Sequence, residues 1–171
     1  MRVLVTGGAG FIGSHLVDAL LAKHHKVLVV DDLSHGRWQN VAAPQKTYSR
    51  AKLSILHPRL EQVFRRFRPE AVYHLAAQID LRRSLQDPAG DAQVNVSGSL
   101  KVFEQCARVK VKRLIFTSTG GAIYGPHAPC PTTETFLPDP TSPYGLAKLA
   151  TERYLGYYRA VRKLNATVLR F

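Results

Sequence analysis

The sequence predicts an α/β fold in which a doubly wound parallel sheet of about six strands carries helices on both faces. Two observations predict this class. Apolar runs of strand length alternate with helical patterns along all 171 residues. A glycine-rich turn joins the first of these runs to the first helical pattern. The length fits one domain, so we expect residues 1–171 to form a single nucleotide-binding domain.

The first thirteen residues carry the most specific pattern. Arg2–Thr6 is typical of a buried parallel strand, and glycines follow in a G-x-x-G-x-x-G pattern at Gly7, Gly10 and Gly13. We expect a helix from Ser14. Such glycines permit a tight turn, the close approach of a pyrophosphate and the packing of helix on strand, as in Rossmann folds. The N–H groups and positive dipole end of the helix then face the phosphates.

Two carboxylates follow the second predicted strand, Lys26–Val30. They are Asp31 and Asp32. Asp31 lies 18 residues after Gly13, where a carboxylate accepts hydrogen bonds from an adenosine ribose. A carboxylate there repels a ribose 2′-phosphate, so we expect NAD rather than NADP. The polar loop over residues 33–40 is expected to close over the adenosine.

The middle of the chain continues the alternation. We expect a weakly apolar edge strand at Lys46–Arg50. A helix is predicted over Leu56–Phe67, with Pro58 in its first turn. A fourth strand is predicted at Ala71–Ala77, and its small last residues leave room for a ligand.

The last third is predicted to form two long helices and two strands. Apolar residues at steps of three and four predict a helix over Ala89–Val109, and Lys112–Thr117 reads as a strand. Six prolines between residues 126 and 143 exclude continuous helix or strand there. Ser142 then caps a helix with Pro143 at its first position, which runs to about residue 163. Ala166–Phe171 is expected to be a sixth, core strand.

Tyr144 and Lys148 are four residues apart on this last helix and therefore share one face. An ammonium beside a phenol lowers the pKa of the phenol, which is ordinarily about 10. The pair is then able to take a proton from a substrate hydroxyl while the carbon gives hydride to NAD. Thr119 or Ser118, at the end of the fifth strand, is placed to share the reacting oxygen; alternatively both hydroxyls bond the turn backbone.

Two interpretations of Asn95, inside the predicted helix, are open. Asparagine has no propensity advantage inside a helix. It either holds a loop or a water near the nicotinamide or is an ordinary exposed helix residue.

The charge is strongly positive, because 24 Lys and Arg against 12 Asp and Glu give +12. A basic chain suggests a nucleic-acid partner. The cations are nevertheless dispersed over several short clusters, so we expect no nucleic acid and interpret most of them as solvated helix faces.

Other classes of site and partner are disfavoured. The two cysteines, Cys106 and Cys130, have no metal-ligand spacing, and the seven histidines are interpreted as surface or helix-end residues, so we expect no metal. No stretch reaches the length of a membrane span, and no signal peptide is apparent. We therefore expect a cytoplasmic protein without a membrane partner.

Seven motifs in order resemble the extended short-chain dehydrogenases, and among them the NAD-dependent epimerases of sugar nucleotides of the UDP-glucose 4-epimerase type. They are residues 6–15 (TGGAGFIGSH), 31–37 (DDLSHGR), 74–78 (HLAAQ), 87–88 (DP), 95–96 (NV), 118–125 (STGGAIYG) and 142–148 (SPYGLAK).

The resemblance implies tightly bound NAD and a set of roles. Thr119 would bond the substrate hydroxyl, Tyr144 would be the base, and Lys148 would bind the ribose and lower the pKa of the tyrosine. The implied cofactor-binding residues, besides these last two, are Gly7, Gly10, Phe11, Ile12, Gly13, Asp31, Asp32, Leu75, Ala76, Ala77, Gln78, Asn95 and Ser118. In this reaction hydride leaves the sugar C4 and returns to the opposite face, with no net redox change.

The resemblance also sets expectations about what this chain leaves out. Members run to nearly twice this length, and their second half supplies most of the nucleotide-sugar pocket. We therefore expect a cofactor-binding and catalytic half without the C-terminal substrate domain, with a UDP-hexose substrate, little activity alone and a possible homodimer. Members usually have an acidic residue that bonds the adenine after the third strand, where this chain has Lys52.

Three alternative functions are open. One is a non-catalytic dinucleotide-binding module. Another is a sugar-nucleotide dehydratase or decarboxylase, although a dehydratase should show an acidic pair after Thr119, where Gly120 and Gly121 stand. The third is a basic nucleic-acid binder, which only the charge favours.

Overall fold

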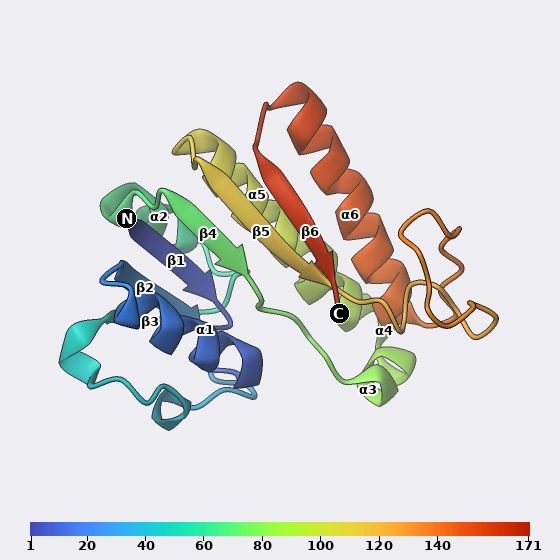
Figure 1. Cartoon of the computed structure of the whole chain (residues 1–171), viewed down its shortest axis with the longest axis horizontal. Coiled ribbons are helices and arrows are strands. Elements are labelled where there is room, and N and C mark those ends of the chain that lie inside the picture. The colour runs from blue at the N-terminus through green and yellow to red at the C-terminus, as the bar shows by residue number, and fades with distance from the viewer.

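A single parallel sheet organises the molecule. The computed structural model describes residues 1–171, and its six strands have the order β3-β2-β1-β4-β5-β6 (Figure 1). All five neighbouring pairs are parallel. The chain builds outward from β1 to β3 and then crosses back to β4, which gives the doubly wound topology. The strands are β1 (Arg2–Thr6), β2 (Lys26–Asp31), β3 (Ser49–Lys52), β4 (Ala71–His74), β5 (Arg113–Ser118) and β6 (Ala166–Arg170).

Helices pack on both faces of the sheet, which confirms the predicted class. On one face of the sheet α1 (Phe11–Ala22) packs against β1 and β2; on the other face lie α2 (Leu60–Phe67), α5 (Ser99–Arg108) and α6 (Pro143–Val161), with α6 over β5 and β6 (Figure 1). Successive side chains of a strand point to opposite faces. Val3 and Val5 therefore join the core under α1, whereas Leu4 joins the larger core under α2, α5 and α6.

The first helix begins earlier than predicted, at Phe11 rather than Ser14. Gly10 is its N-cap, with an extended backbone at φ −78° and ψ −177°, and accepts the Ser14 N–H at 3.0 Å. Gly13 therefore lies inside the helix, where glycine has a low propensity that its close packing against the turn overrides.

The third strand and the second helix are also displaced. Residues 45–47 form a 3₁₀ turn after Pro44, and the strand follows at Ser49–Lys52 rather than at Lys46–Arg50. Its predicted place at the sheet edge is confirmed. The helix begins at Leu60, so Pro58 precedes it, and β4 ends at His74 instead of Ala77.

The predicted helix over Ala89–Val109 is three segments. A short helix α4 (Pro88–Ala92) leads into a π-helical turn (Gln93–Gly98) and then into α5. A further helix that the pattern did not predict, α3 (Leu81–Gln86), precedes them. Asp80 and Asp87 cap α3 and α4 by accepting backbone N–H groups, and these caps explain why short helices form here.

The start of α6 agrees with its predicted capping. Ser142 Oγ accepts the Gly145 N–H at 3.1 Å, and Pro143 occupies the first turn. The helix ends at Val161, two residues before the predicted end. The proline-rich segment before it forms a projecting loop (Figure 1). None of the helices has both the length and the hydropathy that a bilayer crossing requires.

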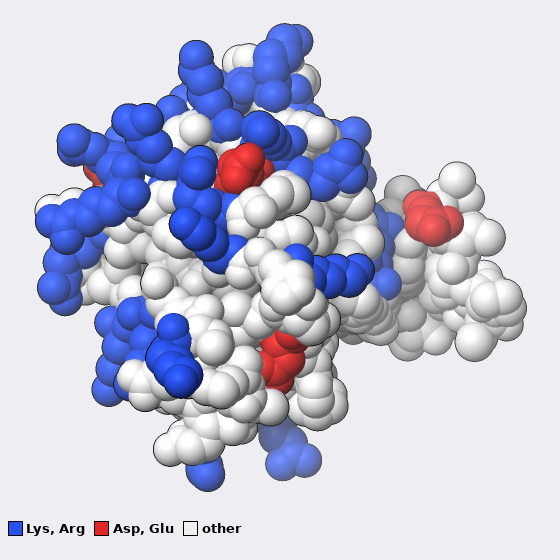
Figure 2. Space-filling model, turned by 60° about the vertical axis from the view of Figure 1, so that its left-hand side comes forward, with Lys and Arg blue, Asp and Glu red and all other residues white.

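The two edges of the sheet have different chemistry. Because all strands are parallel, their carboxyl ends and the turns that follow gather along one edge. The amino ends and the helix C-termini gather at the other. Figure 2 shows that Lys and Arg crowd one part of the surface, while the lobe that projects on the right is nearly free of them.

Candidate active site

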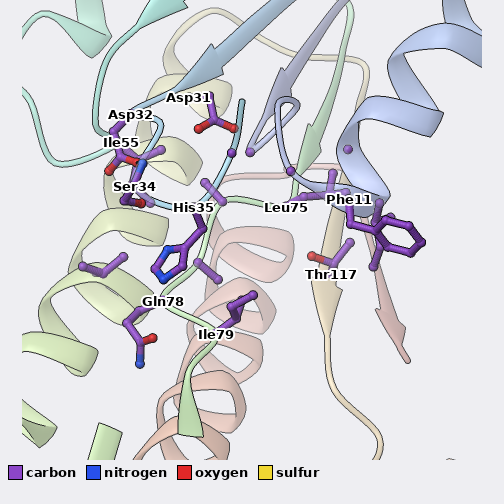
Figure 3. A pocket seen from close by; sticks show the side chains of 18 of the residues that line it. Phe11, Asp31, Asp32, Ser34, His35, Ile55, Leu75, Gln78, Ile79 and Thr117 are labelled. Carbon is purple, nitrogen blue, oxygen red and sulfur yellow. The ribbon is translucent and has the colours of Figure 1, made fainter. Parts of the chain in front are cut away.

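A pocket of about 500 Å³ lies along the carboxyl edge of the sheet, where open α/β sheets bind ligands. Turns after β1, β2, β4 and β5 and the first turns of α1 and α6 line it. Figure 3 shows Asp31, Asp32 and Ser34 at one end, with Leu75 and Thr117 toward the other. All the predicted cofactor and catalytic residues line this pocket except Asn95.

The glycine turn brings backbone against the pocket without side chains in the way. Gly7 has φ +69°, and a Cβ there would lie 2.7 Å from Ala76 N, so only glycine fits. A Cβ on Gly13 would lie 2.2 Å from Gly7 O, which fixes how closely α1 packs on the turn. A Cβ on Gly10 would have Gly7 O as its nearest neighbour, at 3.3 Å. This geometry fits the diphosphate of a dinucleotide.

The first turn of α1 supplies donors for such a diphosphate. The N–H groups of Phe11, Ile12 and Gly13 have no acceptor within the helix, as at every helix N-terminus. Phe11 and Ile12 line the pocket with exposed side chains, 81% and 52% accessible. Backbone donors and the positive helix end therefore face the pocket together.

Asp31 joins the end of β2 to the glycine turn. Its two carboxylate oxygens accept the N–H groups of Ala9 and Leu33, both at 2.9 Å. The carboxylate is buried yet lines the pocket, and each oxygen retains a lone pair for a ribose hydroxyl. Lys52 is exposed and does not line the pocket; its neighbours Leu53 and Ser54 do.

Tyr144 and Lys148 lie together at the other end of the pocket. Lys148 Nζ is 5.9 Å from the Tyr144 ring centroid and donates to Thr117 O at 3.0 Å. Burial lowers the pKa of Lys148 to about 8. The ammonium of Lys148 does not by itself lower the phenol pKa as expected: burial, followed by the charge of Asp91, raises the pKa of Tyr144. Any phenolate here requires a further positive charge in the pocket.

The two hydroxyl groups at the end of β5, those of Ser118 and Thr119, differ in their hydrogen bonding. Thr119 Oγ1 accepts the Ala122 N–H at 3.3 Å, as in an ordinary turn. Ser118 Oγ is buried and has no hydrogen-bond partner, although the residue lines the pocket. A buried hydroxyl without a partner is costly, so a ligand group in the pocket is its natural partner.

Asn95 lies behind the pocket wall and is not an exposed helix residue. Its side chain accepts the Gln78 N–H and donates to Gln78 O, both at 2.9 Å, and also donates to Asp91. Gln78 in turn donates to Asp91. The π-helical turn thus holds the backbone after β4 in place, and Asn95 acts on the pocket through Gln78 rather than by contact.

His74 contradicts the interpretation of every histidine as a surface or helix-end residue. Its ring is fully buried, 2.7 Å from Thr6 Oγ1 and 2.9 Å from Ser99 Oγ. Ser99 donates its own proton to Asn95 O at 2.6 Å, so His74 must donate from Nε2 to Ser99 and accept at Nδ1 from Thr6. Thr6 then accepts the Ala76 N–H. A neutral imidazole therefore links Thr6, directly before the glycine turn, to the start of α5 and, through the Thr6 hydroxyl, to the backbone of Ala76.

This buried imidazole makes stability depend on pH. Burial, aided by the charge of Lys148, lowers the pKa of His74 to about 3 from an ordinary value near 6.5. Below pH 6.5 the unfolded chain therefore binds a proton on this imidazole that the folded chain does not bind. The free energy of unfolding consequently decreases as the pH falls below 6.5. Between pH 6.5 and 5 the loss is about 2 kcal/mol, at about 1.4 kcal/mol per pH unit.

Urea unfolding at a series of pH values measures this loss. We expect the His74→Gln variant to be less stable at pH 7 but to lose about 2 kcal/mol less than the unaltered chain between pH 6.5 and 5. The exposed His127 provides the matched control, because His127→Gln should leave the pH dependence unchanged. Parallel pH profiles for the unaltered chain and His74→Gln would refute a neutral His74.

Twelve further residues line the pocket that the sequence did not single out one by one. Ser34, His35 and Gly36 belong to the polar loop that was expected near the adenosine. The others lie in segments whose pattern predicts only strand, helix or turn: Val30, Leu53, Ser54, Ile55, Ile79, Arg83, Val94, Thr117 and Phe171.

The pocket brings together a glycine turn, a carboxylate placed to bind a ribose and a helix with a Tyr-x-x-x-Lys pattern. Comparison with known proteins shows which family has this combination. The family model described as the NAD dependent epimerase/dehydratase family matches residues 3–171. The chain belongs to this family. The resemblance of the seven motifs is thereby confirmed.

Individual relatives agree with the family. The UDP-glucose 4-epimerase of Mycolicibacterium smegmatis is 43% identical over 169 residues, which cover 98% of this chain and 54% of that protein. The crystal structure of Thermotoga maritima UDP-glucose 4-epimerase with UDP-glucose is 46% identical, with a TM-score of 0.94, over 99% of this chain and 55% of that one. The Thermus thermophilus UDP-glucose 4-epimerase complex with NAD is 43% identical, with a TM-score of 0.92, over 99% and 54%.

The chain spans about half the length of the curated relatives it matches. The shared half holds every element of the pocket described above.

Proposed function

We propose that this chain is the NAD-binding and catalytic domain of a UDP-hexose 4-epimerase. The observation that carries the proposal is one pocket lined by the glycine turn, Asp31, Thr119 and the pair Tyr144 and Lys148. The relatives solved with NAD and with UDP-glucose support the cofactor and the substrate class.

Each residue has a role in binding. The N–H groups at the start of α1 donate to the diphosphate, and the glycines permit its approach. Asp31 accepts from the adenosine ribose and disfavours a 2′-phosphate, which favours NAD over NADP. Lys148 holds the other ribose and places an ammonium near the phenol of Tyr144.

The reaction uses groups at the Tyr144 end. Bound NAD supplies a positive ring that accepts and returns hydride at the sugar C4. Tyr144, as phenolate, takes the proton of the sugar hydroxyl and later returns it. Burial and the charge of Asp91 raise the pKa of this phenol, so the ammonium of Lys148 and the positive ring of bound NAD would together have to lower it. Thr119 donates to the same oxygen and orients it.

An assay of the purified chain tests this function. We expect denaturation of the purified chain to release NAD rather than NADP. We also expect conversion of UDP-galactose to UDP-glucose that is weak for the chain alone and increases when the C-terminal half of the Thermotoga maritima relative is added. Release of no nicotinamide nucleotide would refute the proposal.

A non-catalytic dinucleotide-binding module is the second candidate, favoured by the raised pKa of the Tyr144 phenol, which disfavours its action as a base. NAD release without turnover, even after the second half is added, would establish it.

A homodimer is supported by an apolar stripe on α6, where Leu146, Tyr154, Tyr157 and Val161 are exposed. Light scattering tests it, and a monomeric mass would exclude the dimer.

A further inference from the structure

The positive charge of the chain is concentrated at the edge of the sheet opposite the pocket. More than half of its 24 Lys and Arg lie where strands begin and helices end, and all of these are exposed. We call this set the basic edge. Its members are Arg2, Lys23, Lys26, Arg65, Arg66, Arg68, Arg108, Lys110, Lys112, Arg113, Arg159, Arg162 and Lys163. Figure 2 shows the crowding of Lys and Arg on this part of the surface.

The fold brings together cations that are far apart in the sequence. Arg2 pairs in register with Lys26, and Arg2 Nε donates to Arg68 O at 2.8 Å. Lys112 N–H donates to Glu70 O, which joins the start of β5 to the start of β4. The expectation that no nucleic acid binds rested on the dispersal of the cations along the chain, but in the structure 13 of the 24 lie at one edge of the sheet.

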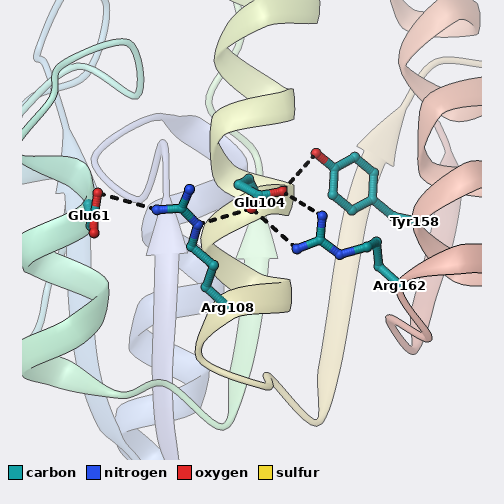
Figure 4. A network of polar contacts seen from close by, with 5 residues as sticks. All are labelled: Glu61, Glu104, Arg108, Tyr158 and Arg162. Atoms are coloured by element: carbon teal, nitrogen blue, oxygen red, sulfur yellow. Dashed lines mark hydrogen bonds and ion pairs between the residues drawn. The ribbon is translucent and has the colours of Figure 1, made fainter.

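The acidic residues at this edge are already paired. Glu104 forms ion pairs with Arg108 at 3.0 Å and with Arg162 at 3.2 Å (Figure 4). Glu61 forms a further ion pair with Arg108 at 3.5 Å. Glu70 lies 3.2 Å from Lys112. The other members of the basic edge have no carboxylate within ion-pair distance.

Helix dipoles do not balance the remaining charge. Each helix C-terminus is equivalent to about −0.5 elementary charge. Four helices, α1, α2, α5 and α6, end at this edge and contribute roughly −2 in total. The unpaired positive charge of the basic edge is several times larger than this dipole charge. The edge therefore carries a strong positive field that the protein's own groups do not neutralise.

Part of the basic edge is concave. A hollow of about 650 Å³ lies between the ends of α2 and α5. Five cations line it and no acidic residue does; the lining residues are Gln62, Arg65, Arg66, Arg68, Arg108, Val109 and Lys110. We propose that the basic edge binds the phosphate backbone of double-stranded nucleic acid, with this hollow at the centre of the contact.

The chemistry of the edge favours a nucleic acid over other polyanions. Arginines outnumber lysines here, and the guanidinium group binds phosphate oxygens bidentately. Strands lie about 4.8 Å apart, so the edge from β2 to β6 spans roughly 19 Å, or five to six phosphates of one duplex strand at about 3.4 Å each. Stable attachment to a membrane needs an apolar anchor beside a basic patch, and protein interfaces have an apolar core, whereas the large apolar side chains exposed at this edge are Met1 and Val161.

Fluorescence anisotropy with a labelled 20-base-pair DNA duplex of arbitrary sequence tests the proposal. With about five phosphates neutralised, the slope of log K against log salt is about −4.5, so the affinity falls about 500-fold between 50 and 200 mM salt. The variant with Arg65→Gln, Arg66→Gln and Lys110→Gln should bind at least tenfold more weakly at 50 mM salt and show a shallower slope. Glu61→Gln, which removes one of the two carboxylates on Arg108, should bind more tightly.

A matched variant removes the same charge elsewhere. Arg59, Arg82 and Arg153 are exposed and lie away from the basic edge, and replacing all three with Gln should change the affinity less than threefold. Equal losses in the two triple variants would overturn the proposal, because the effect would then come from net charge alone. So would displacement of the duplex by 1 mM NAD, or tighter binding at the same salt to vesicles of phosphatidylcholine with about 30% phosphatidylserine.

Discussion

Replacing Tyr144 with Phe is expected to slow the interconversion of UDP-galactose and UDP-glucose by about 10²- to 10⁴-fold, the usual contribution of a positioned acid or base. The phenol oxygen is the group at that end of the pocket that is able to accept and return the substrate proton. Lys148 does not replace it at pH 7, because with a pKa of about 8 its Nζ is mainly an ammonium without a lone pair to accept a proton. The measurement is the turnover rate of the chain supplemented with the C-terminal half of the Thermotoga maritima relative.

Another tyrosine of the same helix provides the control. Tyr157 is half exposed on α6 and lies outside the pocket, so Tyr157→Phe should leave the rate unchanged. The NAD content of Tyr144→Phe should equal that of the unaltered chain, because the substitution removes one oxygen and leaves the ring. A rate within threefold of the unaltered chain would exclude Tyr144 as the base.

Replacing Gly10 with Asp is expected to weaken NAD binding at least 100-fold, or about 2.7 kcal/mol. The new carboxylate lies at the start of α1 and repels the diphosphate. The fold should persist, because a Cβ at Gly10 meets only Gly7 O at 3.3 Å. Aspartate is moreover a preferred N-cap, so the helix itself is not weakened.

Titration calorimetry with NAD and urea unfolding together test this expectation. Gly10→Ala is the matched control: it adds a Cβ without charge and should lower the affinity less than tenfold. Gly13→Ala should instead destabilise the chain, since its Cβ would lie 2.2 Å from Gly7 O. Unchanged NAD affinity in Gly10→Asp would place the diphosphate elsewhere.

Local patterns predicted the sheet and the pocket because each depends on neighbours in the sequence. Buried parallel strands need apolar runs, and the turn that receives a diphosphate needs glycines at fixed steps, as Gly7 and Gly13 show. The same holds for the cap at Ser142, which depends on residues within one helical turn.

What the sequence did not reveal depends on partners far along the chain. Whether Asn95 is exposed or buried is decided by Gln78, which lies 17 residues away. The buried state of His74 depends on Thr6 and Ser99, and the raised pKa of Tyr144 on burial by the completed pocket. Dispersed cations likewise become one face only when parallel strands align their amino ends.

The π-helical turn at Gln93–Gly98 fixes the number of residues that this part of the chain tolerates. A π-helical turn holds one residue more than the α-helical turn it replaces, so losing one residue would let an ordinary α-helix form and would move the Asn95 side chain relative to Asp91. Asp91 and Asn95 would then no longer face the amide of Gln78 together. A single-codon deletion here is accordingly expected to do more harm to the pocket wall than a larger one in the projecting proline-rich loop.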